Sequence, residues 1–194
     1  MGLTGGIGSG KSTLGQMLIE RGLPLIDADA ISRQLTAPGG EAIAPLRALF
    51  GEACVDEAGG LDRAYMRQLV FTNQGAKQLL QQLLHPLILQ QIERDEQHLI
   101  EKGSALVVFD IPLLVESSHW RSRLDRIIVV DCEEDTQIER VVQRSQLSAD
   151  AVRQIMANQA SRLQRLAAAD IVIYNNDHSL DHLRAQAQQI NLQI

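Results

Sequence analysis

A glycine-rich octet near the start of the chain limits the possible folds more than any other feature. Residues 5–12 read Gly-Gly-Ile-Gly-Ser-Gly-Lys-Ser and match the pattern G-x-x-x-x-G-K-[ST]. Four glycines let the backbone turn so that successive N–H groups point inward, where they form a nest for an anion. A helix beginning near Ser12 would add the positive end of its dipole. We call residues 5–12 the phosphate loop, because this pattern binds nucleotide phosphates.

Two side chains of the phosphate loop have roles that follow from their chemistry. Lys11 is a point charge suited to the β- and γ-phosphates of a nucleotide. The hydroxyl of Ser12 is a candidate ligand for Mg²⁺.

Short apolar runs alternate with longer helical patterns along the chain. Four runs are apolar on both faces, as in parallel strands covered by helices on both sides: 23–26, 106–109, 127–130 and 171–174. Residues 1–3 are a shorter candidate strand. Helices are expected over 12–21 with Gly22 as C-cap, over 134–146, after an N-cap at Ser148, and over 180–189. With the phosphate loop, this alternation predicts an α/β fold of the P-loop NTPase type, a doubly wound parallel sheet of about five strands.

Residues 41–102 interrupt the alternation of strands and helices. The stretch contains no convincing strand, and its apolar residues recur at helical spacing. About sixty residues exceed what a crossover between two strands requires, so we expect a helical subdomain with its own role. Within it, Asp62 is a candidate N-cap, and Pro86 is expected to break or restart a helix at His85.

Three aspartates follow predicted strands at the edge where ligands bind in doubly wound sheets. Asp27 and Asp29 come after 23–26, where a carboxylate can hold Mg²⁺ through water or accept a proton from an attacking hydroxyl. Capping of a helix beginning near Ala30 explains Asp27 equally well, whereas we favour catalysis for Asp29. Asp110 ends a run that resembles a Walker B strand, so it could order Mg²⁺ through water or simply terminate the strand.

Arginines cluster late in the chain. Arg140 and Arg144 are four residues apart on a predicted helix and therefore share a face. Arg153, Arg162 and Arg165 follow. Such helices look like a lid that closes over a triphosphate, excludes water and supplies charge in the transition state. A solvated charged face explains any single arginine as well, but we expect at least one of the group to be functional.

Composition excludes several other classes of protein. The chain has 18 Lys and Arg against 24 Asp and Glu, a net charge of −6, and few aromatic residues, which argues against nucleic-acid binding. Its two cysteines have no metal-ligand spacing and are expected to be buried in a reducing compartment. No run of 18 apolar residues and no signal-peptide pattern is present, so we expect a cytoplasmic protein that contacts no membrane.

Taken together, the motifs resemble dephospho-coenzyme A kinases. The matching segments, which follow the family's order over almost the whole chain, are 3–13 (LTGGIGSGKST), 26–29 (IDAD), 84–87 (LHPL), 111–116 (IPLLVE), the helix with Arg140 and Arg144, and 169–170 leading to 175–176. The resemblance implies transfer of the ATP γ-phosphoryl group to the ribose 3′-hydroxyl of dephospho-CoA, the last step of coenzyme A biosynthesis. It also implies ATP and Mg²⁺ as the required small molecules and a fold like that of nucleoside monophosphate kinases.

The resemblance further implies a division of the chain and a set of residue roles. The core would be 1–38, 104–135 and 168–194, the acceptor-binding insert 39–103 and the lid 136–167. Asp29 would take the proton from the 3′-hydroxyl, Arg63 and His85 would lie on the acceptor-binding surface, and Arg140 and Arg144 would act from the lid. ATP would contact Gly8, Ser9, Gly10, Lys11, Ser12, Thr13, Arg144 and Asn175.

Two features depart from the family's pattern. Family members commonly begin several residues earlier, so the first strand is expected to be short. Asp177 stands where the family often has glycine after its Asn-Asn pair, so this turn is expected to differ.

Two other functions remain as alternatives. Another small P-loop kinase, acting on a nucleotide or small metabolite, would also use a helical insert. A nucleotide-gated switch without transfer activity is the second alternative, although the chain lacks the Asn-Lys-x-Asp motif of guanine-specific switches and Asp29 has no evident use in such a protein. The sequence leaves the oligomeric state open, with a monomer as the expectation.

Overall fold

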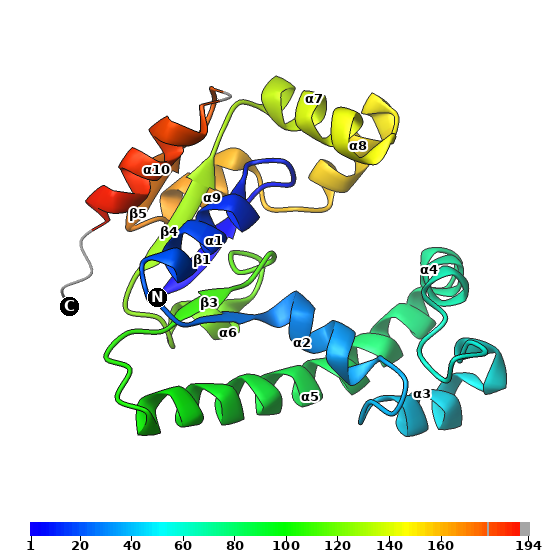
Figure 1. Cartoon of the computed structure of the whole chain (residues 1–194). Coiled ribbons are helices and arrows are strands. Elements are labelled where there is room, and N and C mark those ends of the chain that lie inside the picture. The colour runs from blue at the N-terminus through cyan, green and yellow to red at the C-terminus, as the bar shows by residue number, and fades with distance from the viewer. Residues whose placement is uncertain (178, 191–194) are drawn as a thin grey trace. The chain divides into compact units, whose positions relative to one another are not determined.

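The computed structural model describes residues 1–177 and 179–190, which form two units (Figure 1). The first unit joins Met1–Ile26 to the part of the chain from Gly103 onward, and the second is Asp27–Lys102. The sequence division assigned residues 27–38 to the core, whereas the structure groups them with the helical unit. The reason is that α2 (Ala28–Leu35) packs against α5 (Gln74–Glu101).

The first unit is built on a parallel sheet of five strands in the order β2-β3-β1-β4-β5, which confirms the predicted fold class. The strands are β1 (Gly2–Gly5), β2 (Leu25–Asp27), β3 (Val108–Asp110), β4 (Ile127–Asp131) and β5 (Ile171–Tyr174). The central strand β1 is longer than the predicted stub. It pairs with both neighbours, so that Leu3 lies opposite Asp110 on one side and Ile128 on the other.

Helices cover both faces of the central strands. On one face, α1 (Lys11–Glu20) and α10 (Leu180–Gln189) bury apolar residues such as Leu14, Leu18 and Leu183 against β1 and β4. On the other face lie α6 (Ser118–Arg121) and α9 (Arg162–Ala168) (Figure 1). Trp120 of α6 packs on Phe109 of β3, with ring centroids 6.1 Å apart. Every residue of β4 is buried, as its continuous apolar run predicts.

The last strand differs from the prediction of burial on both faces. In β5, Ile173 is buried, but Val172 is 45% exposed and Tyr174 43% exposed. The strand lies at the edge of the sheet, so helices cover only one of its faces. An apolar run alone does not distinguish an edge strand from a central one.

The remaining helices of the first unit begin close to their predicted starts. Helix α7 spans Glu134–Ser145, and α8 spans Ala149–Ala157 with the predicted N-cap Ser148, whose hydroxyl accepts a hydrogen bond from Ala151 N. Gly22, the predicted cap glycine, follows the C-terminus of α1 with a φ of 83°.

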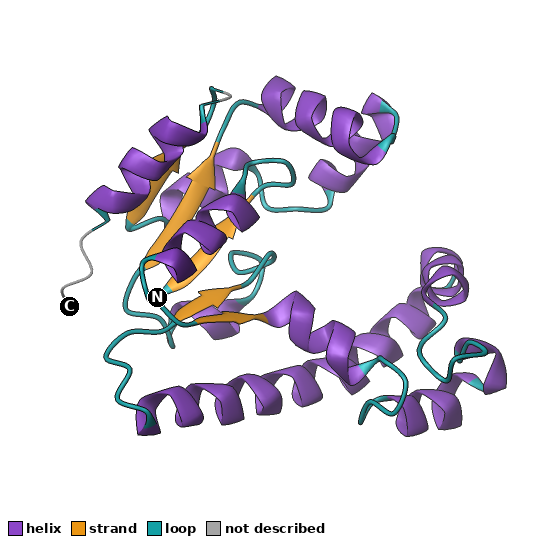
Figure 2. Ribbon diagram, viewed as in Figure 1, coloured by secondary structure: helices purple, strands orange, loops and turns teal. Residues whose placement is uncertain are grey.

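The second unit is helical, as the spacing of its apolar residues predicts (Figure 2). Its elements after α2 are α3 (Ile43–Phe50), the short 3₁₀ helix η1 (Glu52–Cys54), α4 (Arg63–Thr72) and α5. The long helix α5 contacts α2, α3 and α4. Asp62 caps α4 as predicted, because its carboxylate accepts a hydrogen bond from Tyr65 N.

The expected helix break at His85 and Pro86 is wrong. Helix α5 continues through both residues from Gln74 to Glu101. Proline at position 86 cannot donate the usual hydrogen bond to the carbonyl of Gln82. Gln82, His85 and Pro86 are all exposed, so water can satisfy that carbonyl and the contacts of the helix with its neighbours maintain its course.

Both cysteines are free and buried, as expected from their number and spacing. Burial raises the pKa of the Cys54 and Cys132 thiols, because the thiolate is disfavoured away from water. Among the helices of the described residues, none has both the length and the apolar composition that crossing a bilayer requires.

Candidate active site

The phosphate loop connects β1 to α1 in a conformation that depends on two glycines. Gly8 and Gly10 have φ values of 77° and 95°, which L-residues with side chains rarely adopt. A Cβ on Gly8 would lie 2.6 Å from the backbone oxygen of Gln137, and one on Gly10 would lie 2.3 Å from Asn175 Nδ2. Both the turn and the close approach of neighbouring residues therefore require glycine here.

The N-terminus of α1 is open for an anion. Gly10 is its N-cap and provides no side-chain acceptor for the first N–H groups of the helix. Ser12 and Thr13 in the first turn are exposed. These free donors and the positive end of the helix dipole favour phosphate binding at this point.

Lys11 and Asp110 form a largely buried ion pair beside this helix start. The Lys11 ammonium donates to Asp110 Oδ1, with side-chain exposures of 15% and 8%. The parallel register that places Asp110 opposite Leu3 brings β3 next to the strand that leads into the loop. The ion pair thus ties the end of the phosphate loop to the end of β3.

Arg140 and Asn175 hold the loop from the other side. Arg140 Nη1 donates to Asn175 O at 2.9 Å and, at 3.5 Å, to the carbonyls of Gly8 and Ser9. Asn175 Nδ2 donates to Ser9 O at 2.7 Å. The structure thus brings two predicted site residues to the loop, with their donors bound to backbone carbonyls.

Contacts of Asp177 also hold the segment after β5. Arg140 Nη2 donates to Asp177 O at 2.5 Å, and the Asp177 carboxylate lies 2.6 Å from His182 Nδ1. This contact with His182 lowers the pKa of Asp177. The aspartate therefore links the turn to the first part of α10.

Three buried polar atoms around the loop lack hydrogen-bond partners among the described residues. They are Ser9 Oγ, Gln137 Oε1 and Arg165 Nε. A Cβ on Gly6 would lie 2.4 Å from Gln137 Oε1 and 2.9 Å from Arg165 Nη2, so both side chains approach the loop backbone. Gln137 was not among the predicted site residues, although its position three residues before Arg140 on α7 places it on the same helix face.

The other arginines of the predicted lid differ in their surroundings. Arg144 is exposed on α7. Arg153 is exposed on α8 and pairs with Asp150 at 2.8 Å, which fits the interpretation as a solvated charged face. Arg165 is only 7% exposed, and its Nη1 donates to Ala160 O.

Arg162 forms a charge cluster that the sequence did not indicate. Its Nε and Nη2 donate to both oxygens of buried Asp131 at 2.8–3.1 Å, and its Nη1 donates to Glu133. Tyr174 donates to Glu133 at 2.9 Å. The hydrogen bond from Arg162, followed by that from Tyr174, lowers the pKa of Glu133, and the paired carboxylates raise the pKa of Arg162. The cluster fixes the start of α9 to the end of β4.

In the second unit, the structure separates the roles of Asp27 and Asp29. Asp27 is the N-cap of α2, and its Oδ1 accepts a hydrogen bond from Ala30 N at 2.9 Å, which confirms the capping interpretation. Asp29 is exposed in the first turn of α2, two residues beyond the end of β2. Its carboxylate is therefore accessible, whereas that of Asp27 is used for capping.

The predicted acceptor residues of the second unit have different environments. Arg63 begins α4, donates to Thr36 Oγ1 at 2.8 Å and lines a pocket of about 490 Å³ that Arg33 also lines. His85 is exposed on α5. Asp56 and Asp62 also line this pocket, so its two arginines are balanced by two carboxylates, and only a direct contact with a guanidinium group would favour an anionic ligand there.

The described residues contain no group of three or more His, Cys, Asp or Glu side chains able to hold a metal ion. Magnesium bound with a nucleotide takes much of its coordination from phosphates and water and needs few protein ligands. The Ser12 hydroxyl and the Asp110 carboxylate, the two predicted ligands, fit this kind of site.

We predict that Arg162→Ala lowers the free energy of unfolding by about 2–4 kcal/mol, because it leaves the buried Asp131 carboxylate without its bidentate partner. Arg162→Lys should recover part of the loss, since lysine restores the charge but not the planar fork. Urea denaturation measures both effects. The matched control is Arg153→Ala, which removes an exposed pair and should change stability by less than about 0.5 kcal/mol. Equal losses for the two alanine variants would contradict a structural role for Arg162.

Comparison with known proteins agrees with this geometry. The sequence model of the dephospho-CoA kinase family matches residues 1–181. A dephospho-CoA kinase of Bordetella parapertussis is 52% identical over 192 residues, covering 98% of this chain and 88% of the relative.

Two solved structures are similar to this chain over nearly its whole length. A crystal structure of a protein from Thermus thermophilus has a TM-score of 0.83 and 30% identity and covers 96% of this chain and 92% of its own. The dephospho-CoA kinase from Campylobacter jejuni has a TM-score of 0.74 and 26% identity, with coverages of 97% and 93%. With the family match over residues 1–181, these likenesses show that the chain belongs to the dephospho-CoA kinase family.

Proposed function

We propose that this protein transfers the γ-phosphoryl group of ATP to the ribose 3′-hydroxyl of dephospho-CoA. The observation that carries the proposal is the phosphate loop, with its open helix start and its Lys11–Asp110 pair, in a chain of the dephospho-CoA kinase family. In the reaction, a bond forms between the 3′-oxygen and the γ-phosphorus, and the bond from that phosphorus to the bridging oxygen of ADP breaks.

The first unit binds ATP in this proposal. Backbone N–H groups between Gly8 and Thr13 donate to the phosphates, and Lys11 follows the transferring group as a point charge. Asn175, which already donates to Ser9 O, lies beside the adenine, and Arg144 contributes charge from α7. The exposure of Arg144 and of Ser12 and Thr13 supports their assignments, because they are accessible to a ligand, whereas Asn175 is only 7% exposed.

Magnesium is the metal proposed for the site. When bound, it neutralises charge on the phosphate oxygens. The Ser12 hydroxyl would hold it directly and Asp110 through water. The exposed hydroxyl at the start of α1 and the carboxylate at the end of β3 support this pair as the protein's contribution.

Asp29 is the proposed general base, which accepts the proton that the ribose 3′-hydroxyl loses as the oxygen attacks phosphorus. Two observations support this role. Asp29 lies just beyond the carboxyl end of β2, where ligands bind in doubly wound sheets, and its carboxylate is exposed. Asp27 is less suited, since its carboxylate caps α2.

The helical unit is the proposed acceptor-binding part of the chain. Arg63, at a pocket that Arg33, Asp56 and Asp62 also line, would contact the acceptor's anionic groups through its guanidinium, and exposed His85 would lie on the same binding surface. Residues 136–167 are proposed to act as a lid. Arg140 positions the loop in this arrangement, because its donors already bind loop carbonyls. The free, buried thiols support a reducing compartment such as the cytoplasm.

Acceptor choice tests the proposed activity. Release of ADP should be measured with dephospho-CoA, AMP, CMP and shikimate side by side. We expect a much higher kcat/KM with dephospho-CoA than with AMP, because the remote pantetheine arm supplies binding energy for orientation. Equal kcat/KM for dephospho-CoA and AMP would instead favour a nucleotide kinase.

Lys11→Ala should lower the rate of transfer by about 10³-fold, since it removes the charge that accompanies the transferring group. The fold should persist with a lower free energy of unfolding, because glycines set the shape of the loop but the largely buried Asp110 loses its lysine partner; circular dichroism checks the fold. Near-normal turnover by a folded Lys11→Ala protein would refute the assignment of the phosphate loop to ATP.

Asp29→Asn should lower kcat by about 10²–10⁴-fold, because asparagine keeps the size of the side chain but cannot accept the proton. The Kd of ATP should change little, since the phosphate loop makes those contacts. Asp27→Asn is the matched control and should retain turnover, because an asparagine side chain also caps helices. Loss of ATP·Mg²⁺ binding with normal turnover at saturation would make Asp29 a metal-organising residue instead.

A further inference from the structure

The junction between α8 and α9, residues 158–161, is bonded directly to the phosphate loop. Gln159 Oε1 accepts a hydrogen bond from Ile7 N at 3.0 Å. Ile7 immediately precedes Gly8, the first loop residue with positive φ. The amide of Gln159 therefore fixes a peptide group at the point where the loop turns.

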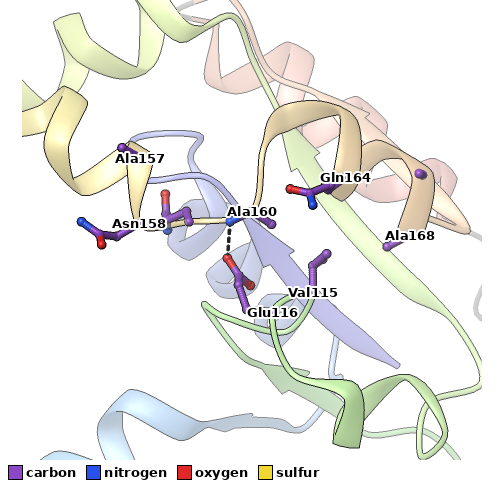
Figure 3. Close-up of a pocket in the computed structure, with 9 residues that line it drawn as sticks. Val115, Glu116, Ala157, Asn158, Ala160, Gln164 and Ala168 are labelled. Atoms are coloured by element: carbon purple, nitrogen blue, oxygen red, sulfur yellow. Dashed lines mark hydrogen bonds between the residues drawn. The ribbon is translucent and has the colours of Figure 1, made fainter. Parts of the chain in front are cut away.

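The residue after Gln159 is fixed through both of its backbone polar groups. Ala160 N donates to Glu116 Oε1 at 2.6 Å, a contact shown in Figure 3. Ala160 O accepts a hydrogen bond from Arg165, the arginine that also approaches Gly6. The side chain of Gln159 is thus presented to Ile7 from a peptide segment whose position is set by two charged groups.

The next residue, Ser161, is the N-cap of α9. Ser161 and Gln164 form a reciprocal capping box, with Ser161 N donating to Gln164 Oε1 at 2.8 Å and Gln164 N to Ser161 Oγ at 3.2 Å. This fixes the direction in which the chain leaves the junction.

Hydrogen bonds from three parts of the chain hold this junction beside an open pocket. A pocket of about 700 Å³ opens beside it, lined by Val115, Glu116, Gln164 and residues 157–160 (Figure 3). Glu116 is exposed, and Gln159 and Ala160 are partly exposed. Because residues 158–161 are exposed or partly exposed, loss of one of these hydrogen bonds should change their position.

We propose that Gln159 and Glu116 are positioning residues for the phosphate loop. Gln159 restrains the Ile7 peptide, so that the following N–H groups converge on the nucleotide phosphates. Glu116 acts through Ala160 by keeping Gln159 in reach of Ile7. The inference takes from the proposed function only that the loop binds ATP or ADP.

A competing role for the same contact makes the opposite prediction. If Gln159 blocks a donor that a phosphate oxygen needs, its removal should strengthen nucleotide binding. If it preorganises the loop, its removal should weaken binding. Calorimetric titration of the full-length protein with Mg·ADP distinguishes the two and requires no acceptor, so its result does not depend on whether dephospho-CoA is the substrate.

For Gln159→Ala we expect a three- to tenfold higher Kd of Mg·ADP and a similar rise in the KM for ATP, as for loss of one hydrogen bond. Glu116→Ala should change both in the same direction. Glu116→Gln should restore near wild-type values, because the glutamine amide oxygen can still accept from Ala160 N. The double alanine variant should be no weaker than Gln159→Ala alone, since Glu116 acts through Gln159.

Gln154→Ala is the matched control, an exposed glutamine on α8, and should leave the Kd of Mg·ADP unchanged. Melting temperatures measured without nucleotide separate positioning from stability, and they should stay within a few degrees of wild type for all variants. An unchanged or lower Kd in Gln159→Ala would overturn the proposal. So would additive effects in the double variant, or failure of Glu116→Gln to restore binding.

Discussion

The close approach of β4 and α7 to the backbone of the phosphate loop is the contact on which the rest of the structure depends. A Cβ on Gly5 would lie 2.7 Å from Val130 O, and one on Gly8 would lie 2.6 Å from Gln137 O. These neighbours are backbone atoms of β4 and α7, which cannot move aside as the end of a flexible side chain can. The loop can therefore keep its N–H groups pointing inward only if glycine stands where β4 and α7 approach it. A side chain at either position would push β4 or α7 away from the loop.

Local sequence signals predicted most of the elements that carry the candidate site. The octet, the run that forms β4 and the caps Asp62 and Ser148 each act within a few residues, so the sequence contains the whole signal. The cluster of Arg162 with Asp131 and Glu133 was not predicted, because those residues are about thirty positions apart and the packing of α9 on β4 brings them together. The contact of Gln159 with Ile7 spans 152 residues and has no local signature.

Two of the errors in the fold, the break at Pro86 and the burial of both faces of β5, share one physical cause. Proline lowers the helix preference of α5 locally, and the apolar run of β5 favours burial on both faces, yet tertiary context decides each outcome. Water can reach the carbonyl that Pro86 leaves without its helical hydrogen bond, because α5 is exposed there. Val172 and Tyr174 lie at the surface, because β5 is at the edge of the sheet. The elements packed around a helix or strand determine how much of it is exposed, so the residues of that element alone do not predict its exposure fully.

The net charge of −6 opposes the binding of a polyanion, so the attraction must come from groups near the phosphate loop. At physiological ionic strength the Debye length is about 8 Å, so exposed charges farther away than this contribute little at the loop. The local charges differ from the average of the protein, because Asp110 is paired with Lys11 in a largely buried setting and Arg140 lies against the loop carbonyls. Short-range donors, the start of α1 and these two cations must therefore supply the attraction, which makes the exact shape of the loop more important than the overall charge. The contact of Gln159 with Ile7 orients one peptide of the loop, and it therefore affects the short-range hydrogen bonds between the loop and the nucleotide phosphates.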